Sequence, residues 1–281
     1  MTINVFSSTI CQLGEGAFWH PEREQFFWFD ILGKRLLTRD SEGERHWNFD
    51  DCVSAAGWVD RDTLVLADGS ALWRFDIESG SRERLVGLEE DMPHTRSNDG
   101  RADPFGGFWI GSMGRNAEPG TGAIYRYYRG ALHTLVENIT ITNAICFSPD
   151  GRHAYYTDTM DGRILRQPLD GDGWPKGAAD VFLDLSDEPF GPDGAVVDQQ
   201  GRFWNAQWGA SRVACYDPDG CLVDTYALPT PQASCPAFGG PDLSTLFVTT
   251  AADGLTEDAM AGKTFAITTT TKGQSEHQVI L

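Results

Sequence analysis

The chain has 281 residues, of which 41 % are hydrophobic, so it can bury one large core, and its length allows one or two domains. Its 22 Lys and Arg residues stand against 41 Asp and Glu residues, which gives a formal net charge of -19. A surface of this sign repels phosphate backbones and anionic lipid headgroups, so we expect neither a nucleic acid nor a membrane partner.

The first residues, MTINVFSSTI, lack the basic, apolar and small-residue regions of a secretion signal. No stretch of the chain reaches the roughly 18 uncharged apolar residues of a membrane-spanning helix. The six cysteines include no C-x-x-C pair, and nothing in the sequence indicates an oxidising compartment. We therefore expect a soluble cytoplasmic protein whose thiols are free.

A repeated pattern runs along the chain, in which an apolar or aromatic strand, a turn with Pro, Gly or Asp, and a second aromatic strand follow one another. Its six copies read, in chain order, GAFWHPEREQFFWFD, AAGWVDRDTLVLAD, NDGRADPFGGFWIGS, NAICFSPDGRHAYYTD, DGAVVDQQGRFWNAQW and CPAFGGPDLSTLFVTT. A more polar third strand, such as ALWRFDI or GAIYRYY, follows the second strand. Each copy therefore has the composition of a small antiparallel sheet.

The spacing of the copies indicates the architecture. When the turns are superposed, the residue five positions before each turn recurs at intervals of 40, 43, 45, 50 and 42 residues. Several strands per unit of this length are typical of propeller blades. We predict an all-β fold, a six-bladed β-propeller, that occupies residues 1–281 as a single domain.

Two further expectations concern the end of the chain. A ring of blades must close to avoid exposed sheet edges, so the early strand INVFSS should pair with the blade built from FAITTTTKGQSEHQVIL. The segment LTEDAMAGK, residues 255–263, has a composition that allows one short helix.

The repeat brings six residues to equivalent places. The innermost strand of every blade runs along the central channel, so positions at its start point toward one axis. In the superposed copies these positions hold Glu15, Ala55, Asn98, Asn143, Asp193 and Cys235. Carboxylate and amide oxygens are ligands for a divalent cation, although polar residues beside turns also cap local backbone groups.

Two buried carboxylates that face each other repel unless a cation or a proton lies between them. A cation bound by Glu15, Asp193 and the side-chain carbonyl of Asn143 would cancel both charges. Oxygen ligands of this kind suit Ca²⁺, Mg²⁺, Mn²⁺ or Zn²⁺, and the sequence does not choose among them.

Further candidates flank these positions. Arg96 lies two residues before Asn98, on the same side of an extended chain, so both could reach a substrate; alternatively, Arg96 is a surface cation or a partner of Asp99. Trp208 follows a strand end and could border the pocket. Asp30 and Asp158 end matching second strands, and we expect them to bond turn backbone rather than take part in chemistry.

At these residues the chain resembles the senescence marker protein, gluconolactonase and luciferin-regenerating enzyme family. The matching stretches are LGEGAFW, RSNDGRADPFGGFWIGSM, TNAICFSPDGRHAYYTDT and PDGAVVDQQGRFWNAQWG, and the likeness extends from about Gln12 to Thr250. The resemblance implies a six-bladed propeller with one catalytic divalent cation.

The resemblance also implies residue roles. The family's Glu, Asn and Asp ligands correspond to Glu15, Asn143 and Asp193, and its proposed acid/base carboxylate falls on Asp193. Its substrate-contacting Arg and Asn match Arg96 and Asn98. For a further substrate-facing Glu of the animal members, the loop GRNAEPGTG offers two candidates, Asn116 and Glu118.

Members similar to this chain hydrolyse lactones of sugar acids. We therefore expect metal-dependent hydrolysis of an aldonolactone, such as a glucono-, galactono-, xylono- or arabinonolactone, to the aldonic acid in carbohydrate catabolism. In this hypothesis the cation polarises the carbonyl, and Asp193 takes a proton from the attacking water and returns it to the ring oxygen. Two alternatives stay open, namely a metal-dependent esterase or phosphotriesterase for a less polar substrate, and a non-enzymatic cation-binding propeller.

Overall fold

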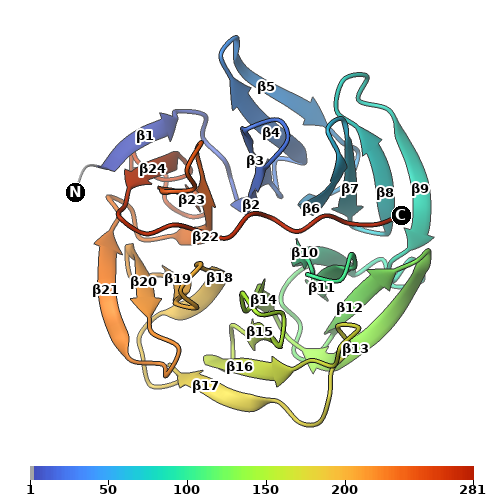
Figure 1. The fold of residues 1–281 in the computed structure, drawn as a ribbon. Helices are drawn as coiled ribbons and strands as arrows, with labels where there is room; N and C mark the ends of the chain where they lie inside the picture. Colours follow the sequence, from blue (N-terminus) through green and yellow to red (C-terminus); the bar gives the residue numbers. More distant parts are fainter. Residues whose placement is uncertain (1–2) are drawn as a thin grey trace.

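Six four-stranded antiparallel sheets stand around a central channel (Figure 1), and the predicted six-bladed β-propeller is confirmed. The computed structural model describes residues 3–281. In five sheets the strands follow chain order from the channel outward, and in the sixth the outermost strand comes from the beginning of the chain.

The first three blades hold strands β2 to β13. Blade 1 contains β2 (Gly14–His20), β3 (Gln25–Asp30), β4 (Arg35–Asp40) and β5 (Gly43–Asn48). Blade 2 contains β6 (Val53–Asp60), β7 (Thr63–Asp68), β8 (Ala71–Asp76) and β9 (Arg82–Gly87). Blade 3 contains β10 (Thr95–Ala102), β11 (Phe108–Gly114), β12 (Gly122–Tyr128) and β13 (Ala131–Ile139).

The other three blades complete the ring. Blade 4 contains β14 (Thr142–Phe147), β15 (His153–Asp158), β16 (Arg163–Pro168) and β17 (Asp180–Asp184). Blade 5 contains β18 (Gly191–Val197), β19 (Phe203–Trp208), β20 (Arg212–Tyr216) and β21 (Leu222–Ala227). Blade 6 contains β22 (Ala233–Gly239), β23 (Thr245–Thr250), β24 (Thr264–Thr268) and β1 (Ile3–Ser7).

The core lies between the blades. Successive side chains of a strand point to opposite faces of its sheet. In β3, Phe27 and Phe29 therefore pack toward Leu64 of blade 2, whereas Phe26 and Trp28 pack toward Phe247 of blade 6. Apolar clusters of this kind fill every boundary between neighbouring blades, which explains why the second strand of each copy is apolar on both faces.

The innermost strands share an irregularity at their start. The register of the first ladder shifts between Glu15 and Phe18, Ser97 and Gly100, Asn143 and Cys146, and Pro192 and Ala195. A bulge of this kind bends the strand and redirects a side chain. In blade 1 the bulge requires glycine, because Gly16 has a φ of 56° and a Cβ there would lie 2.1 Å from the Ser54 carbonyl oxygen.

The two ends of the chain meet in blade 6. Strand β1 pairs antiparallel with β24, with Ile3 opposite Ile267. The ring is therefore joined by hydrogen bonds between strands that are far apart in the sequence.

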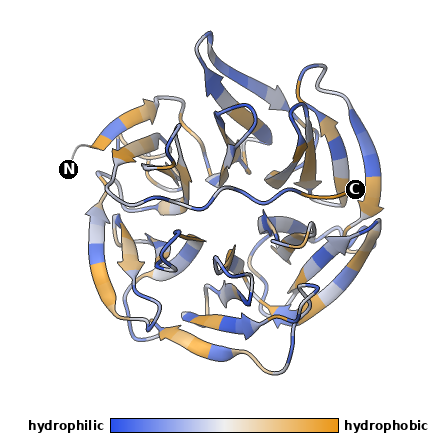
Figure 2. Cartoon of the chain, in the orientation of Figure 1, coloured by the Kyte–Doolittle hydropathy of each residue, from blue (hydrophilic) through white to orange (hydrophobic). Residues whose placement is uncertain are grey.

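Residues 269–281, here called the C-terminal strap, cross the channel at the ends of the inner strands (Figure 1). The Gln274 side chain donates hydrogen bonds to the carbonyl oxygens of Phe147 (3.0 Å) and Val197 (2.8 Å). The Val279 backbone N–H donates to Trp58 O at 2.8 Å. Figure 2 shows that the strap is mostly hydrophilic along its crossing and hydrophobic at its C-terminal end. The strap thus connects several blades and covers one mouth of the channel.

The short helix predicted over residues 255–263 is wrong. The segment forms successive turns, with hydrogen bonds from Leu255 N to Ala252 O (3.0 Å) and from Ala261 N to Asp258 O (3.2 Å). Asp258 Oδ1 accepts the N–H of Met260 at 2.8 Å, a local bond that competes with helix formation. Residues 3–281 contain no helix, and hence none long enough to cross a bilayer. The six cysteines are free thiols, and all but Cys221 are buried.

Candidate functional site

A cavity of about 690 Å³ opens at the mouth of the channel where the inner strands begin. All five side chains singled out from the sequence line this cavity: Glu15, Arg96, Asn98, Asn143 and Asp193. Trp208 lines it as well, as expected for a residue at a strand end. Ala55 and Cys235, the other two members of the six-fold register, are buried and take no part in the lining.

The two carboxylates are held in the same way. Glu15 Oε2 accepts the N–H of Gly16 at 3.1 Å, and Asp193 Oδ1 accepts the N–H of Gly194 at 3.0 Å. Their second oxygens, Glu15 Oε1 and Asp193 Oδ2, accept no hydrogen bond from residues 3–281. Each bulge therefore fixes one carboxylate oxygen and leaves the other free at the cavity.

A chain of hydrogen bonds orients the two amides between blades 3, 4 and 5. Arg96 Nη1 donates to Asn98 Oδ1 at 2.8 Å, and Asn98 Nδ2 donates to Asn143 Oδ1 at 3.1 Å. Asn143 Nδ2 donates to Thr159 Oγ1 at 2.9 Å, and that hydroxyl donates to Pro192 O at 2.8 Å. Because each nitrogen has its acceptor, the amide oxygen of Asn143 is fixed on the side of Asn98.

Arg96 is not a surface cation. Its side chain is buried and hydrogen-bonded to Asn98 and to Ser97 O, and it forms no ion pair with Asp99 in the part of the chain that the structure describes. Burial lowers the pKa of the Arg96 guanidinium.

Several carboxylates lie close together in this part of the channel. Burial and the nearby Asp99 carboxylate raise the pKa of Glu15 to about 8, and burial, Glu15 and Asp99 also raise the pKa of Asp193. Two buried carboxylates that repel each other favour the uptake of a proton, which relieves the repulsion. In the absence of a cation, a proton therefore resides on this pair near neutral pH.

The buried charges fit a divalent cation. Arg101 pairs with Glu276 of the C-terminal strap, so these two charges cancel. Glu15 and Asp193 face Arg96, whereas Asp99 lies near Arg101, so the four carboxylates Glu15, Asp99, Asp193 and Glu276 exceed the two arginines by two negative charges when all are ionised. With two free carboxylate oxygens and one amide oxygen, the donor set suits a hard or borderline divalent cation. No group of three or more His, Cys, Asp or Glu side chains within residues 3–281 forms an alternative metal centre.

The sequence did not single out every residue of the cavity. Arg115, in the loop where Asn116 and Glu118 were the candidates, lines the cavity, whereas those two residues do not. Instead, the Asn116 side chain donates to Glu118 Oε1 at 2.9 Å on the exposed surface. Thr159, which orients Asn143, was also missed. A signal for Arg115 is its position two residues after Met113, which pairs with Arg96 in the ladder.

Asp30 and Asp158 hold turns outside the cavity. Asp30 Oδ1 accepts the N–H groups of Leu13 and Gly33, each at 3.0 Å. Asp158 Oδ1 accepts the N–H of Ile141 at 3.0 Å, beside the start of β14. Both carboxylates thus anchor the segments that precede innermost strands.

Two lactonases and one solved structure are similar to this chain. It is 37 % identical over 260 residues to the L-arabinolactonase of Azospirillum brasilense, which covers 89 % of this chain and 84 % of that protein. It is 34 % identical over 272 residues to the pentonolactonase of Haloferax volcanii, which covers 94 % and 89 % of the two chains. The crystal structure of regucalcin from Agrobacterium tumefaciens, described as a calcium-binding protein, superposes with a TM-score of 0.95 at 38 % identity and covers 99 % of this chain and 97 % of that one.

Residues 13–252 match the region described as SMP-30/Gluconolactonase/LRE-like. This region contains the five cavity residues and all six innermost strands. The chain therefore belongs to the SMP-30, gluconolactonase and LRE-like family.

Proposed function

We propose that this protein is a divalent-cation-dependent hydrolase that opens the lactone ring of a sugar acid to give the aldonic acid in carbohydrate catabolism. One observation carries the proposal: two buried carboxylates, Glu15 and Asp193, and the amide of Asn143 line the same cavity as Arg96. The lactonase names of the relatives support the choice of substrate class.

Glu15, Asn143 and Asp193 would hold the cation, which is Ca²⁺, Zn²⁺, Mn²⁺ or Mg²⁺. When bound, such an ion supplies positive charge for the oxyanion that develops as water adds to a lactone carbonyl. The calcium-binding description of the Agrobacterium protein makes Ca²⁺ the first ion to test.

Asp193 is the proposed acid and base. Its Oδ1 is fixed by the Gly194 N–H, so Oδ2 would serve the cation with one lone pair and, with the other, take a proton from water and return it to the departing ring oxygen. A single carboxyl in both roles requires that water and ring oxygen lie on the same side of the lactone.

Arg96 and Asn98 contribute differently to binding. The Nε and Nη2 groups of Arg96 donate to no acceptor within residues 3–281, so they are free for substrate hydroxyls. Both N–H bonds of Asn98 are used, by Thr142 O at 2.8 Å and by Asn143 Oδ1. Asn98 therefore offers substrate only an oxygen acceptor, and its main effect is to orient Arg96 and Asn143.

A second candidate function has one observation in its favour. Apolar side chains also line the cavity, namely Leu13, Leu32, Met113, Ile141, Met160, Phe190 and Trp208. Apolar lining of this kind suits a less polar ester or phosphotriester. The free donors of Arg96 favour a polyhydroxylated substrate instead.

A pH-drop assay tests the proposal. Five- and six-carbon aldonolactones, a p-nitrophenyl ester and a phosphotriester are each incubated with metal-free protein and with Ca²⁺, Zn²⁺, Mn²⁺ or Mg²⁺. We expect cation-dependent hydrolysis of at least one aldonolactone with the highest kcat/KM of the panel. Faster turnover of the ester or phosphotriester would favour the second function, and no turnover in folded, cation-loaded protein would favour a non-enzymatic propeller.

A further inference from the structure

Arg115 lies beside Arg96 on the wall of the cavity. Arg96 pairs with Met113 in the β10–β11 ladder, and Arg115 follows two residues later, so its side chain leaves the strand on the same face. The backbone N–H of Arg115 donates to His94 O at 2.8 Å, which continues the pairing past the strand end. Both arginines therefore line the part of the cavity that blade 3 forms.

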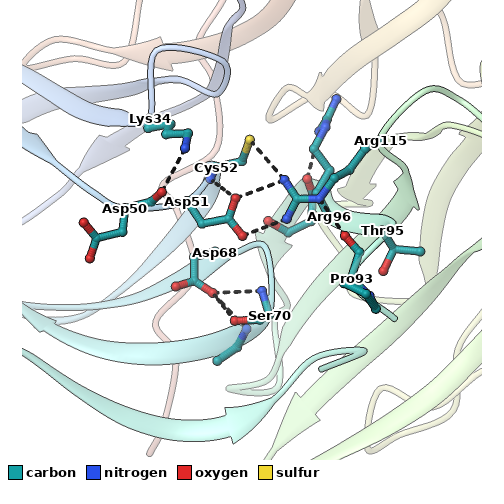
Figure 3. A network of polar contacts seen from close by, with 12 residues as sticks. Lys34, Asp50, Asp51, Cys52, Asp68, Ser70, Pro93, Thr95, Arg96 and Arg115 are labelled. Atoms are coloured by element: carbon teal, nitrogen blue, oxygen red, sulfur yellow. Dashed lines mark hydrogen bonds and ion pairs between the residues drawn. The ribbon is translucent and has the colours of Figure 1, made fainter. Parts of the chain in front are cut away.

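The Arg115 side chain is held between the segment that leads into blade 2 and the segment that leads into blade 3 (Figure 3). Its Nη1 lies 3.0 Å from Asp51 Oδ1 and its Nη2 lies 2.7 Å from Asp51 Oδ2, a two-point ion pair. Its Nε donates to Pro93 O at 3.1 Å, and Nη1 also lies 3.8 Å from Cys52 Sγ. A guanidinium held at this many points loses little further freedom when it binds a ligand.

The ion pair is closely packed against blade 2. A Cβ at Gly69 would lie 2.3 Å from Asp51 Oδ2 and 2.7 Å from Arg115 Nη2. The absence of a side chain at residue 69 thus leaves room for the pair, and a larger residue there would displace it.

One donor of Arg115 remains free. A guanidinium has five N–H bonds, and those of Nε, Nη1 and one of Nη2 point to Pro93, Asp51 and Cys52. The second N–H of Nη2 has no acceptor within residues 3–281. Since Asp51 balances the charge of Arg115, this donor suits a neutral hydroxyl oxygen better than a carboxylate or a phosphate.

We propose that Arg115 is a specificity-determining residue that donates from Nη2 to one hydroxyl group of the lactone, and that Asp51 positions it. This inference rests on the proposed lactonase function. It places the substrate hydroxyl between Arg96 and Arg115.

The test compares kcat/KM for a pentonolactone and for its singly deoxygenated analogues. For the parent lactone, Arg115→Ala should lower kcat/KM by about tenfold, mainly through KM, because a charged donor to a substrate hydroxyl is lost. For one deoxy analogue, wild type and Arg115→Ala should be equal, since the hydroxyl that Arg115 binds is missing. Similar losses on the parent and on every analogue would overturn the proposal.

Asp51 is tested by a double-mutant cycle. Asp51→Ala should raise KM for the parent lactone, and the effect should disappear when Arg115 is already alanine. An undiminished effect in that background would show that Asp51 acts independently of Arg115, against the proposal.

Two controls keep the outcome interpretable. Arg166→Ala removes an equally exposed arginine that pairs with Asp180 on the outer strands of blade 4, and it should leave kcat/KM unchanged for every substrate. Arg115→Gln retains one amide donor and serves if the alanine variant is unstable. If wild type hydrolyses no lactone, the proposed function itself fails and the inference falls with it, whereas turnover with uniform losses refutes only the role of Arg115.

Discussion

The side-chain nitrogen of Asn98 lies 3.1 Å from Asn143 Oδ1, to which it donates a hydrogen bond across the boundary between blades 3 and 4. This bond, with that from Asn143 Nδ2 to Thr159, determines which end of the Asn143 amide is the oxygen. A rotated amide would present N–H groups to a cation and repel it. The bond thus connects the substrate-side residue Asn98 to the proposed cation site.

Replacing Asn98 with alanine should therefore weaken cation binding. The Asn143 amide loses the donor that holds its oxygen, and loss of such an outer partner typically lowers metal affinity about 10- to 100-fold. Calorimetric titration of metal-free protein with Ca²⁺ measures the change. Asn116→Ala is the matched control, because Asn116 is an amide of the same blade outside the cavity lining. An unchanged affinity in Asn98→Ala would show that Asn143 needs no such support.

Removal of the cation should abolish hydrolysis and lower the unfolding temperature. A ligand that binds only the folded protein stabilises it by about 2.7 kcal/mol at a concentration 100 times its Kd. Differential scanning calorimetry before and after exhaustive chelation, followed by addition of each cation, measures both the loss and its reversal. Full activity in protein whose metal content is verified to be negligible would refute the role of the cation.

Substitutions of Arg96 and Asp193 should separate binding from chemistry. Arg96→Ala should mainly raise KM, because contacts to non-reacting hydroxyls are similar in the ground and transition states. Asp193→Asn keeps a possible oxygen ligand but removes the base, so kcat should fall by at least about 10²-fold while some cation still binds. Steady-state kinetics on cation-loaded variants distinguishes the two, and near-normal kcat in loaded Asp193→Asn would reduce Asp193 to a ligand.

His20 should make the protein acid-sensitive. This buried histidine donates from Nε2 to Asp60 O (3.1 Å) and accepts the Arg23 N–H at Nδ1 (3.3 Å), so it has no room for a second proton. Burial lowers its pKa from 6.5 to about 4. The stability that depends on neutral His20 is present above pH 6.5 and lost as the pH falls toward 4, an effect of about 3 kcal/mol at most.

Urea unfolding between pH 7.5 and 4 measures this contribution. His20→Gln should be less stable than wild type at pH 7.5, and the difference should shrink as the pH falls. His46→Gln, at an exposed histidine, provides the reference curve. A constant difference between wild type and His20→Gln across this range would exclude His20 as the source.

Local patterns in the sequence determined the blades and the inner positions of the site. The alternating aromatic strands and their turns recur every 40 to 50 residues, and the period of two assigns each side chain to one face of a blade. Glu15, Asn98, Asn143 and Asp193 could be placed together because each lies at the same distance from its own turn. The short helix over residues 255–263 was mispredicted because composition alone does not show that Asp258 bonds its own turn.

Tertiary structure alone decided the contacts between blades. Arg115 is held by Asp51, 64 residues earlier in the chain, and no pattern in either segment specifies that partner. The raised pKa of Glu15 and the pairing of Arg101 with Glu276 likewise arise when six inner strands and the C-terminal strap converge on one axis. A repeat fixes where a residue lies within its own blade, whereas the charge, burial and partners of that residue depend on side chains that neighbouring blades bring to the channel.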